Sequence, residues 1–409
     1  MMIPASRQAP PPSDPSQDPI IFLTEALPFP AVGAVKYRDY HLIALLSQYR
    51  PVKVLYFSNP EDRHPTDPAD QNPRITYVPV KRSRNNLVGE IRSLFRSAAL
   101  NGSCPRMTAI LRRESAQGRI LWVSRLSMAG YIPRARKMGY RIILDEHHIE
   151  SHRIMDDYFD DRTQILTLLS ALQARFYEKA FCDEADTIVT ASELAAARMR
   201  KLSPKGEVRV IPNGIEDLRF KDITTRGGKG LLFWGVLNRP ANEAGLIWFC
   251  DEILPRLRMR LKEKIPRIRV AGTAPRASLR TRLEREGIEI LPASFDIKEA
   301  LADTSVCFFP CVQGDAAHLR ILEAMAAGRA VVTTGRGAAG LSLTPTYDIF
   351  IADHPDPFAG SICKLLTDPR LLEAISDHAR KTIDSRYDWQ ASAQRVEHLL
   401  KEIGLIISS

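Results

Sequence analysis

One stretch of the sequence, residues 306–341, restricts the fold more than any other. It contains a short apolar run over residues 306–309, a polar loop over 313–317, apolar residues at helical spacing over 318–327, and a second apolar run over 331–334. Such runs are typical of buried parallel strands, and spacings of three and four residues are those of an amphipathic helix. Strand, loop, helix and strand form a βαβ unit, so the sequence predicts an α/β fold with a parallel sheet.

The loop and the helix start in this unit form a candidate ligand site. Ligands of open α/β sheets bind at the carboxyl ends of the strands, where this loop lies. A helix N-terminus favours a phosphate, and Arg320 adds a full positive charge in the first turn. Glu323, one turn later, repels phosphate but can accept hydrogen bonds from sugar hydroxyl groups. The combination predicts a nucleotide-sugar site, and the alternative interpretation is an Arg–Glu surface pair on a core helix.

The string LRILEAMAAGRAVVTT, with the later glycine-rich segment 337–341, resembles the donor-site signature of the group 1, family-four-like glycosyltransferases of the GT-B fold. The resemblance implies that Glu323 is the second glutamate of a Glu-x7-Glu motif and holds the donor ribose. Asp315 then stands for the first glutamate and faces the donor sugar, and Arg320 stands where the family often has lysine. The same resemblance assigns donor binding to Gly314, His318 and Leu319.

The length of 409 residues predicts two domains, because a single hydrophobic core rarely grows to that size. The resemblance implies two doubly wound, Rossmann-like α/β domains that face a central cleft. We expect a disordered tail over residues 1–19, which is rich in Pro, Ser and Asp, and an acceptor-side domain over 20–216. A linker over 217–230, a nucleotide-sugar-binding domain over 231–385 and a helical segment over 386–409 that packs back towards the first domain complete the expected organisation.

Three positions in the first half are further candidates. Gly33 is the one glycine that matches the glycine-rich loop which the family places after its first strand. Arg38, in the first turn of the next predicted helix, is expected either to reach the cleft or to face solvent. His147 follows the predicted strand 141–144 in a sequence that resembles the family's Asp-x-His-Asn-x-Glu, which implies a role near the donor sugar. A structural role or a metal site shared with His148 are the alternatives, but neighbours on an extended chain point apart.

The loop after Gly235 departs from the commonest family pattern, which places an arginine and a lysine there to hold the diphosphate. This chain has Val236 and Ala241 at those positions. The Pro-Ala-Asn sequence after Arg239 fits a branch of the family with Pro-x-Asn in this loop, which lacks the pair too. Arg320, Arg239 and the helix N-terminus are then the expected partners of the diphosphate.

The positive charge is concentrated in residues 81–141, which carry fourteen Lys and Arg against two acids, +12, compared with +9 for the whole chain. Leu87, Ile91 and Leu94 recur there at helical spacing beside arginines. One interpretation is a surface that lies on anionic lipid and collects a lipid-linked acceptor, and the other is a core-facing helix with solvated arginines. No basic motif with interleaved aromatic residues is present, so nucleic acid is not an expected partner.

The sequence gives no sign of a signal peptide or of an apolar run long enough to span a membrane. Its six cysteines form no Cys-x-x-Cys pair, so we expect reduced thiols and no metal site in a cytoplasmic protein, peripheral to the membrane at most.

We therefore predict a metal-independent, retaining glycosyltransferase of the hexosyltransferase type that needs no cofactor. It would move a sugar from a nucleotide-sugar donor to a glycan or lipid-linked acceptor in polysaccharide or glycoconjugate biosynthesis. Catalytic roles are expected for His147, Arg320 and Asp315, and Arg320 with the helix terminus would stabilise the departing diphosphate in place of a metal. The alternatives are a nucleotide-sugar epimerase of the same fold and a non-catalytic protein that binds sugar nucleotides.

Overall fold

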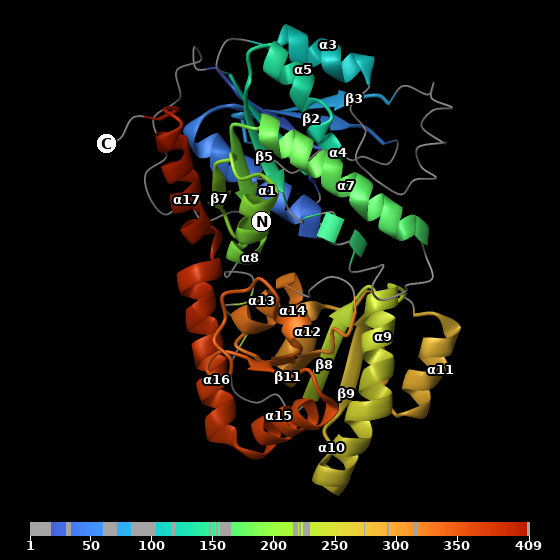
Figure 1. Cartoon of the computed structure of the whole chain (residues 1–409). Helices are drawn as coiled ribbons and strands as arrows, with labels where there is room; N and C mark the ends of the chain where they lie inside the picture. The colour runs from blue at the N-terminus through green and yellow to red at the C-terminus, as the bar shows by residue number, and fades with distance from the viewer. Residues whose placement is uncertain are drawn as a thin grey trace. The chain divides into compact units, whose positions relative to one another are not determined.

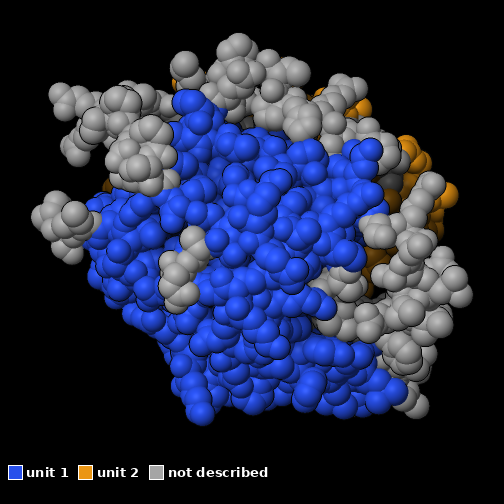
Figure 2. Space-filling model, turned by 90° about the horizontal axis from the view of Figure 1, so that it is seen from above, with its two compact units in different colours: residues 1–212, 393–409 blue, residues 213–392 orange. Residues whose placement is uncertain are grey.

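The structure of the protein is a computed structural model. It describes residues 18–29, 34–59, 72–82, 104–115, 119–146, 149, 151–152, 154–155, 165–215, 220, 222–223, 230–273, 275–292, 294–313 and 318–406. The chain divides into two compact units, the first made of residues 1–212 and 393–409 and the second of residues 213–392 (Figure 2). The first unit thus contains the C-terminal segment as well as the N-terminal half.

The first unit is built on a seven-stranded sheet with the order β3-β2-β1-β4-β5-β6-β7, in which all neighbours are parallel (Figure 1). The strands are β1 (Ile20–Leu23), β2 (Val52–Phe57), β3 (Ile75–Val80), β4 (Ile120–Ser124), β5 (Arg141–Glu146), β6 (Thr187–Thr190) and β7 (Val208–Val210). The chain runs outward from β1 to β3 and then returns to β4 on the other side of β1. This reversal is that of a doubly wound sheet, as the sequence predicts.

The helices of the first unit are α1 (Ala34–Tyr49), α3 (Pro105–Arg113), α4 (Leu126–Ala129), α5 (Ile132–Lys137), α7 (Ile165–Glu184) and α8 (Glu193–Leu202). Helix α5 packs beside both α3 and α7 (Figure 1). The last helix, α17 (Trp389–Glu402), begins in the second unit and ends in the first. None of the described helices has the length and apolarity needed to cross a membrane.

The second unit has a six-stranded parallel sheet with the order β10-β9-β8-β11-β12-β13. Its strands are β8 (Gly230–Gly235), β9 (Ile268–Gly272), β10 (Glu289–Leu291), β11 (Thr304–Phe309), β12 (Ala330–Thr333) and β13 (Phe350–Ile351). Its helices are α9 (Pro240–Trp248), the π-helix η3 (Phe249–Ile253), α10 (Leu254–Leu261), the 3₁₀ turn η4 (Lys262–Lys264), α11 (Ala277–Arg285), α12 (Ile297–Ala302), α13 (His318–Ala326), α14 (Gly335–Ala338), α15 (Pro355–Thr367), α16 (Pro369–Thr382) and the π-helix η5 (Ile383–Tyr387).

The predicted βαβ unit is present as β11, α13 and β12. The two strands are parallel neighbours, with Val306 opposite Ala330. The inner face of α13 is apolar, and Ile321, Leu322 and Met325 are completely buried. Gly328 follows the helix with a φ of +63°, a conformation that glycine adopts without steric cost, and its N–H donates to the carbonyl of Met325 at 2.9 Å.

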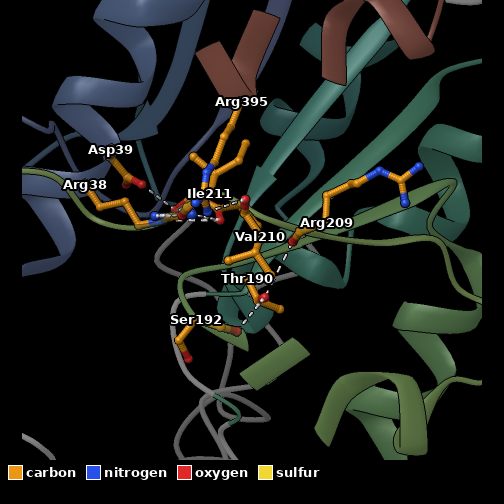
Figure 3. Close-up of polar contacts among 10 residues, drawn as sticks. Arg38, Asp39, Thr190, Ser192, Arg209, Val210, Ile211 and Arg395 are labelled. Carbon is orange, nitrogen blue, oxygen red and sulfur yellow. Dashed lines mark hydrogen bonds and ion pairs between the residues drawn. The ribbon is translucent and has the colours of Figure 1, made fainter. Parts of the chain in front are cut away.

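Arg38, in α1, is buried and ion-paired, so the expectation that it faces solvent is wrong. Its side chain is 1% exposed. Its Nε and Nη2 atoms donate to the carboxylate of Asp145, at the end of β5, with Nη2 2.7 Å from Oδ1. Its Nη1 atom donates to the carbonyl of Ile211, just after β7, at 2.8 Å (Figure 3). Arg38 therefore joins one helix to the ends of two strands.

Asp39, the next residue, joins α1 to two further strand ends through its carboxylate. It accepts hydrogen bonds from the hydroxyl groups of Thr24, directly after β1, and Ser124, at the end of β4, both at 2.7 Å. The C-terminal segment closes the same region, because Arg395 donates to the carbonyl of Val210 at 3.5 Å (Figure 3). The strand ends of the first unit are thus held by a small set of buried charges.

We predict that Arg38→Met lowers the free energy of unfolding of the first unit by about 3–5 kcal/mol, because the buried carboxylate of Asp145 loses its guanidinium partner. The double variant Arg38→Met with Asp145→Leu should recover most of that loss, since a buried ion pair can often be replaced by apolar groups. Arg113→Met, at an exposed position, is the control and should change stability by about 0.5 kcal/mol or less. Denaturant unfolding measures all three, and a double variant as unstable as Arg38→Met would contradict the pairing argument.

Candidate functional site

The candidate site lies at the carboxyl edge of the second sheet. Strands β9, β8 and β11 are parallel neighbours, so their carboxyl ends meet at this edge. Helix α9 follows β8, and helix α13 follows β11, so the first turns of both helices are brought to the same edge. A hydrogen bond from the Gln313 amide to the carbonyl of Pro240, at 3.3 Å, joins the loop after β11 to the start of α9.

Arg320 lies across the end of β8. Its Nη1 atom donates to the carbonyl of Trp234 at 2.8 Å, and its Nη2 atom donates to Oδ1 of Asn242 at 3.1 Å. The guanidinium carbon lies 5.4 Å from the ring centres of both Phe233 and Phe309, within the range of a cation–π interaction. Two of its five N–H donors and its aromatic surroundings thus fix the orientation of the cation.

Glu323 is held by the same tryptophan. Its Oε2 atom accepts a hydrogen bond from the indole Nε1 of Trp234 at 3.3 Å. The indole packs edge-on against Phe309, with the ring centres 5.0 Å apart, which fixes its direction. The carboxylate and the guanidinium of α13 are therefore placed by two different groups of one residue at the end of β8.

The loop after β8 brings a second cation close to Arg320. The side-chain amide of Asn242 donates to the carbonyl of Val236 at 2.9 Å and also accepts from Arg320, so it closes the loop and orients the guanidinium together. Arg239 precedes the first turn of α9 and is exposed. Burial lowers the pKa of Arg320, the charge of Arg239 adds to this lowering, and the carboxylate of Glu323 opposes it. The edge thus carries two positive charges and one negative charge that interact.

Three glycines allow this close arrangement. A Cβ atom on Gly235 would lie 2.5 Å from Nη1 of Arg320, so a side chain there would displace the guanidinium. Gly272, opposite Gly235 on β9, has a φ of +144°, and its Cβ would lie 1.7 Å from the carbonyl oxygen of Gly235. Gly245, in α9, would meet the carbonyl of Pro310 at 2.1 Å. The first glycine makes room for a side chain and the other two for backbone.

The structure brings together several predicted site residues and leaves others undescribed. Arg320, Glu323, Gly235 and Arg239 lie at one edge as described above, and Leu319 packs its partly buried side chain on the core of the second unit. His318 begins α13, but its side chain is outside the described part of the structure. The remaining predicted site residues lie outside the described residues, and they are Gly33, His147, Gly314 and Asp315.

Two residues of the site are missed when each motif is considered separately. Trp234 stands in an apolar run that carries no charged group, yet its carbonyl and indole hold both charged groups of α13. Asn242 is noticed through its Pro-x-Asn context, but its bond to a residue 78 positions away is not visible in the sequence. Among the described residues, no group of three or more His, Cys, Asp or Glu side chains is arranged to hold a metal ion.

Comparison with solved structures identifies the class of fold. Sucrose-phosphate synthase from Thermosynechococcus elongatus is similar with a TM-score of 0.69 and 15% identity, covering 95% of this chain and 99% of that chain. Anabaena HepE, solved in complex with UDP-glucose, has a TM-score of 0.62 and 14% identity, covering 94% and 99%. An E. coli trehalose-6-phosphate protein bound with UDP-2-fluoro glucose has a TM-score of 0.63 and 13% identity, covering 95% and 99%. The two Rossmann-like units and the similarity to these structures over almost the whole chain define the GT-B fold.

Sequence comparison matches part of the chain to a known family. Residues 228–368, which form most of the second unit, match the family described as glycosyl transferases group 1. No curated protein matches the chain. The second unit therefore resembles the group 1 glycosyltransferases over residues 228–368, and the chain as a whole has the GT-B fold.

We predict opposite outcomes for alanine at two neighbouring glycines. Gly235→Ala should leave the second unit folded, because the clashing atom is the end of a flexible side chain, but should move Arg320 and lower activity by about tenfold or more. Gly272→Ala should instead destabilise the unit, because its Cβ meets backbone and its φ is unfavourable for alanine. Thermal unfolding and a transfer assay on both variants test this pair. Normal activity in folded Gly235→Ala would show that the position of Arg320 is unimportant.

Proposed function

We propose that the protein is a retaining glycosyltransferase that moves a sugar from a nucleotide-sugar donor to a glycan or lipid-linked acceptor, in polysaccharide or glycoconjugate biosynthesis. One observation carries the proposal: Trp234 holds a guanidinium and a carboxylate from successive turns of α13 at the edge where α/β sheets bind ligands. The ligands bound in two similar structures, UDP-glucose and UDP-2-fluoro glucose, are consistent with such a donor.

The proposed donor site assigns each charge to one part of the ligand. Glu323 accepts hydrogen bonds from the ribose hydroxyl groups, because an ionised carboxylate is the strongest acceptor available to them. Arg320, Arg239 and the N-terminus of α13 meet the diphosphate. The donor-site positions proposed from the family motif are Gly314, Asp315, His318 and Leu319 in the second unit, with Gly33 and His147 in the first.

The proposed chemistry needs no metal ion. Negative charge grows on the leaving diphosphate as the sugar departs, and a preoriented guanidinium stabilises that charge without reorganising during the reaction. The diphosphate then helps to deprotonate the acceptor on the face that it leaves, which retains the configuration of the sugar. This proposal requires that transfer persists when divalent cations are removed with a chelator.

Of the two proposed acceptors, the lipid-linked one is favoured by the exposed positive charge of the first unit. Within the described residues, Arg106, Arg112, Arg134 and Lys137 are exposed on α3 and α5. Other cations of the basic segment are partly neutralised by ion pairs, which are Arg82 and Arg125 with Glu25, Arg119 with Asp18, and Arg136 with Asp186. The apolar positions Leu87, Ile91 and Leu94 lie outside the described residues. The net positive surface would attract anionic lipid, where such an acceptor is found.

We predict that Glu323→Ala weakens binding of the donor nucleotide by about ten- to a hundredfold, or roughly 1.5–3 kcal/mol, because the ribose loses charge-assisted hydrogen bonds. Glu323→Gln should lose part of that affinity while its amide oxygen can still accept from Trp234. Glu284→Ala, on α11, is the matched control outside the site. A panel of nucleotide sugars first identifies the donor that binds best. Calorimetry with the nucleotide of that donor then measures the affinity. Unchanged affinity in folded Glu323→Ala would remove the carboxylate from the site.

We predict that Arg320→Ala lowers the rate of transfer by more than about tenfold, or 1.4 kcal/mol, because the missing cation is needed most when the diphosphate departs. Its effect on donor affinity should be smaller than its effect on the rate. Arg239→Ala is the comparison, and a larger loss there would assign the main role to Arg239. NMR of the product's anomeric configuration tests retention, and isomerisation of the donor without acceptor would indicate an epimerase instead.

A further inference from the structure

Helix α7 exposes three large apolar side chains on one face. Leu169 is 51% exposed, Leu172 is 52% exposed and Phe176 is 71% exposed. On the opposite side, Ala171 and Ala174 are buried. A helix that covers a sheet normally directs its large apolar residues inward, so this arrangement needs a physical reason.

The three exposed residues form one continuous stripe, because they are separated by three and four positions and so lie above one another on a helix. We call Leu169, Leu172 and Phe176 the α7 stripe. The helix is fixed to the first unit on its other face. Glu178 is buried and accepts a hydrogen bond from the backbone N–H of Ser151 at 3.2 Å, and Phe181 packs into the main core of the unit. The α7 stripe is therefore held outward.

Positive charge accompanies the α7 stripe. Arg175 is exposed on the same outward face, next to Phe176, and Lys179 follows one turn later, paired with Asp183 at 2.8 Å. Helix α5 packs beside α7 (Figure 1), with Arg136 donating to the carbonyl of Glu184 at the end of α7. Arg134 and Lys137 of α5 are exposed. Leucine and phenylalanine on a face that also carries cations are the features of a helix that lies in the interface of an anionic membrane.

We propose that α7 docks the first unit on an anionic lipid surface. The α7 stripe enters the boundary between headgroups and acyl chains, while Arg175 and the cations of α5 contact the headgroups. A second copy of the chain is a poorer partner, because apposed α7 stripes would bring Arg175 from both copies into one apolar contact. The proposal rests on the lipid-linked acceptor proposed above, and it names the element that would bring the acceptor's membrane to the first unit.

Co-sedimentation of the full chain with vesicles tests the proposal. The vesicles contain phosphatidylglycerol with phosphatidylcholine, or phosphatidylcholine alone. We expect the chain to bind the anionic vesicles, and added salt to weaken that binding because exposed charges are screened. The triple variant Leu169→Gln, Leu172→Gln and Phe176→Gln should lower the partition coefficient by about tenfold or more, since it removes the inserted apolar area. Arg175→Gln should lower binding at low salt and have a smaller effect at high salt.

A matched control separates the α7 stripe from exposed apolar surface in general. Met259, on α10 of the second unit, is 69% exposed, and Met259→Gln should leave vesicle binding unchanged. Nucleotide affinity of the triple variant should equal that of the wild type, so loss of docking is distinguishable from failure of the donor site. Wild-type protein that does not bind anionic vesicles, or a triple variant that binds them normally, overturns the proposal. So does a dimer of the wild type, seen by sedimentation, that the triple variant loses.

Discussion

The candidate site depends on the close approach of two strand ends in the second unit. Gly272 must lack a side chain, because its Cβ would lie 1.7 Å from the carbonyl oxygen of Gly235. Gly235 must lack one as well, because the guanidinium of Arg320 occupies that space. The absence of two side chains lets Arg320 reach the Trp234 carbonyl, and the site's cation is thus positioned by backbone. A backbone anchor inside a packed sheet moves less than a side-chain anchor in a loop, which favours a fixed electrostatic environment.

In the first unit, buried charged side chains fix the strand ends. Arg38 and Asp39 are neighbours in α1, and between them they bind groups at or just after the ends of β1, β4, β5 and β7. Apolar packing could cover these strand ends with similar stability, since a buried ion pair gains little over well-packed hydrophobic residues. The ion pair between Arg38 and Asp145 instead fixes the orientation of α1 relative to β5, because a bidentate guanidinium–carboxylate contact allows few relative orientations. The buried charges of α1 therefore fix the edge of the first sheet.

The sequence predicts much of this fold, because short apolar runs mark buried parallel strands. The predicted strands at 306–309 and 141–144 lie within β11 and β5, and the predicted run at 331–334 overlaps β12. The central strand β4 is not predicted, because arginines flank its apolar run inside a segment dominated by charge. The site is less accessible to prediction, since its pairings join residues far apart in the chain. Arg38 and Asp145 are separated by 107 positions, and Trp234 and Glu323 by 89. Residue type indicates what each group can bind, but only the fold shows which partner it meets.

The loop after β8 lacks the arginine and lysine of the commonest pattern in the family that the chain resembles, and its Asn242 instead orients Arg320. Val236 and Ala241 have no charged side chain to offer a diphosphate. The Asn242 side chain closes their loop through the Val236 carbonyl and orients Arg320 with its own oxygen. A guanidinium that is already oriented loses little conformational entropy when an anion binds, so one such group achieves more than a flexible one. Under the proposed function, Arg320 carries the charge that two residues share elsewhere, with Arg239 as its neighbour. Asn242, which bears no charge, is then as important to the electrostatics of the site as the arginine that it orients.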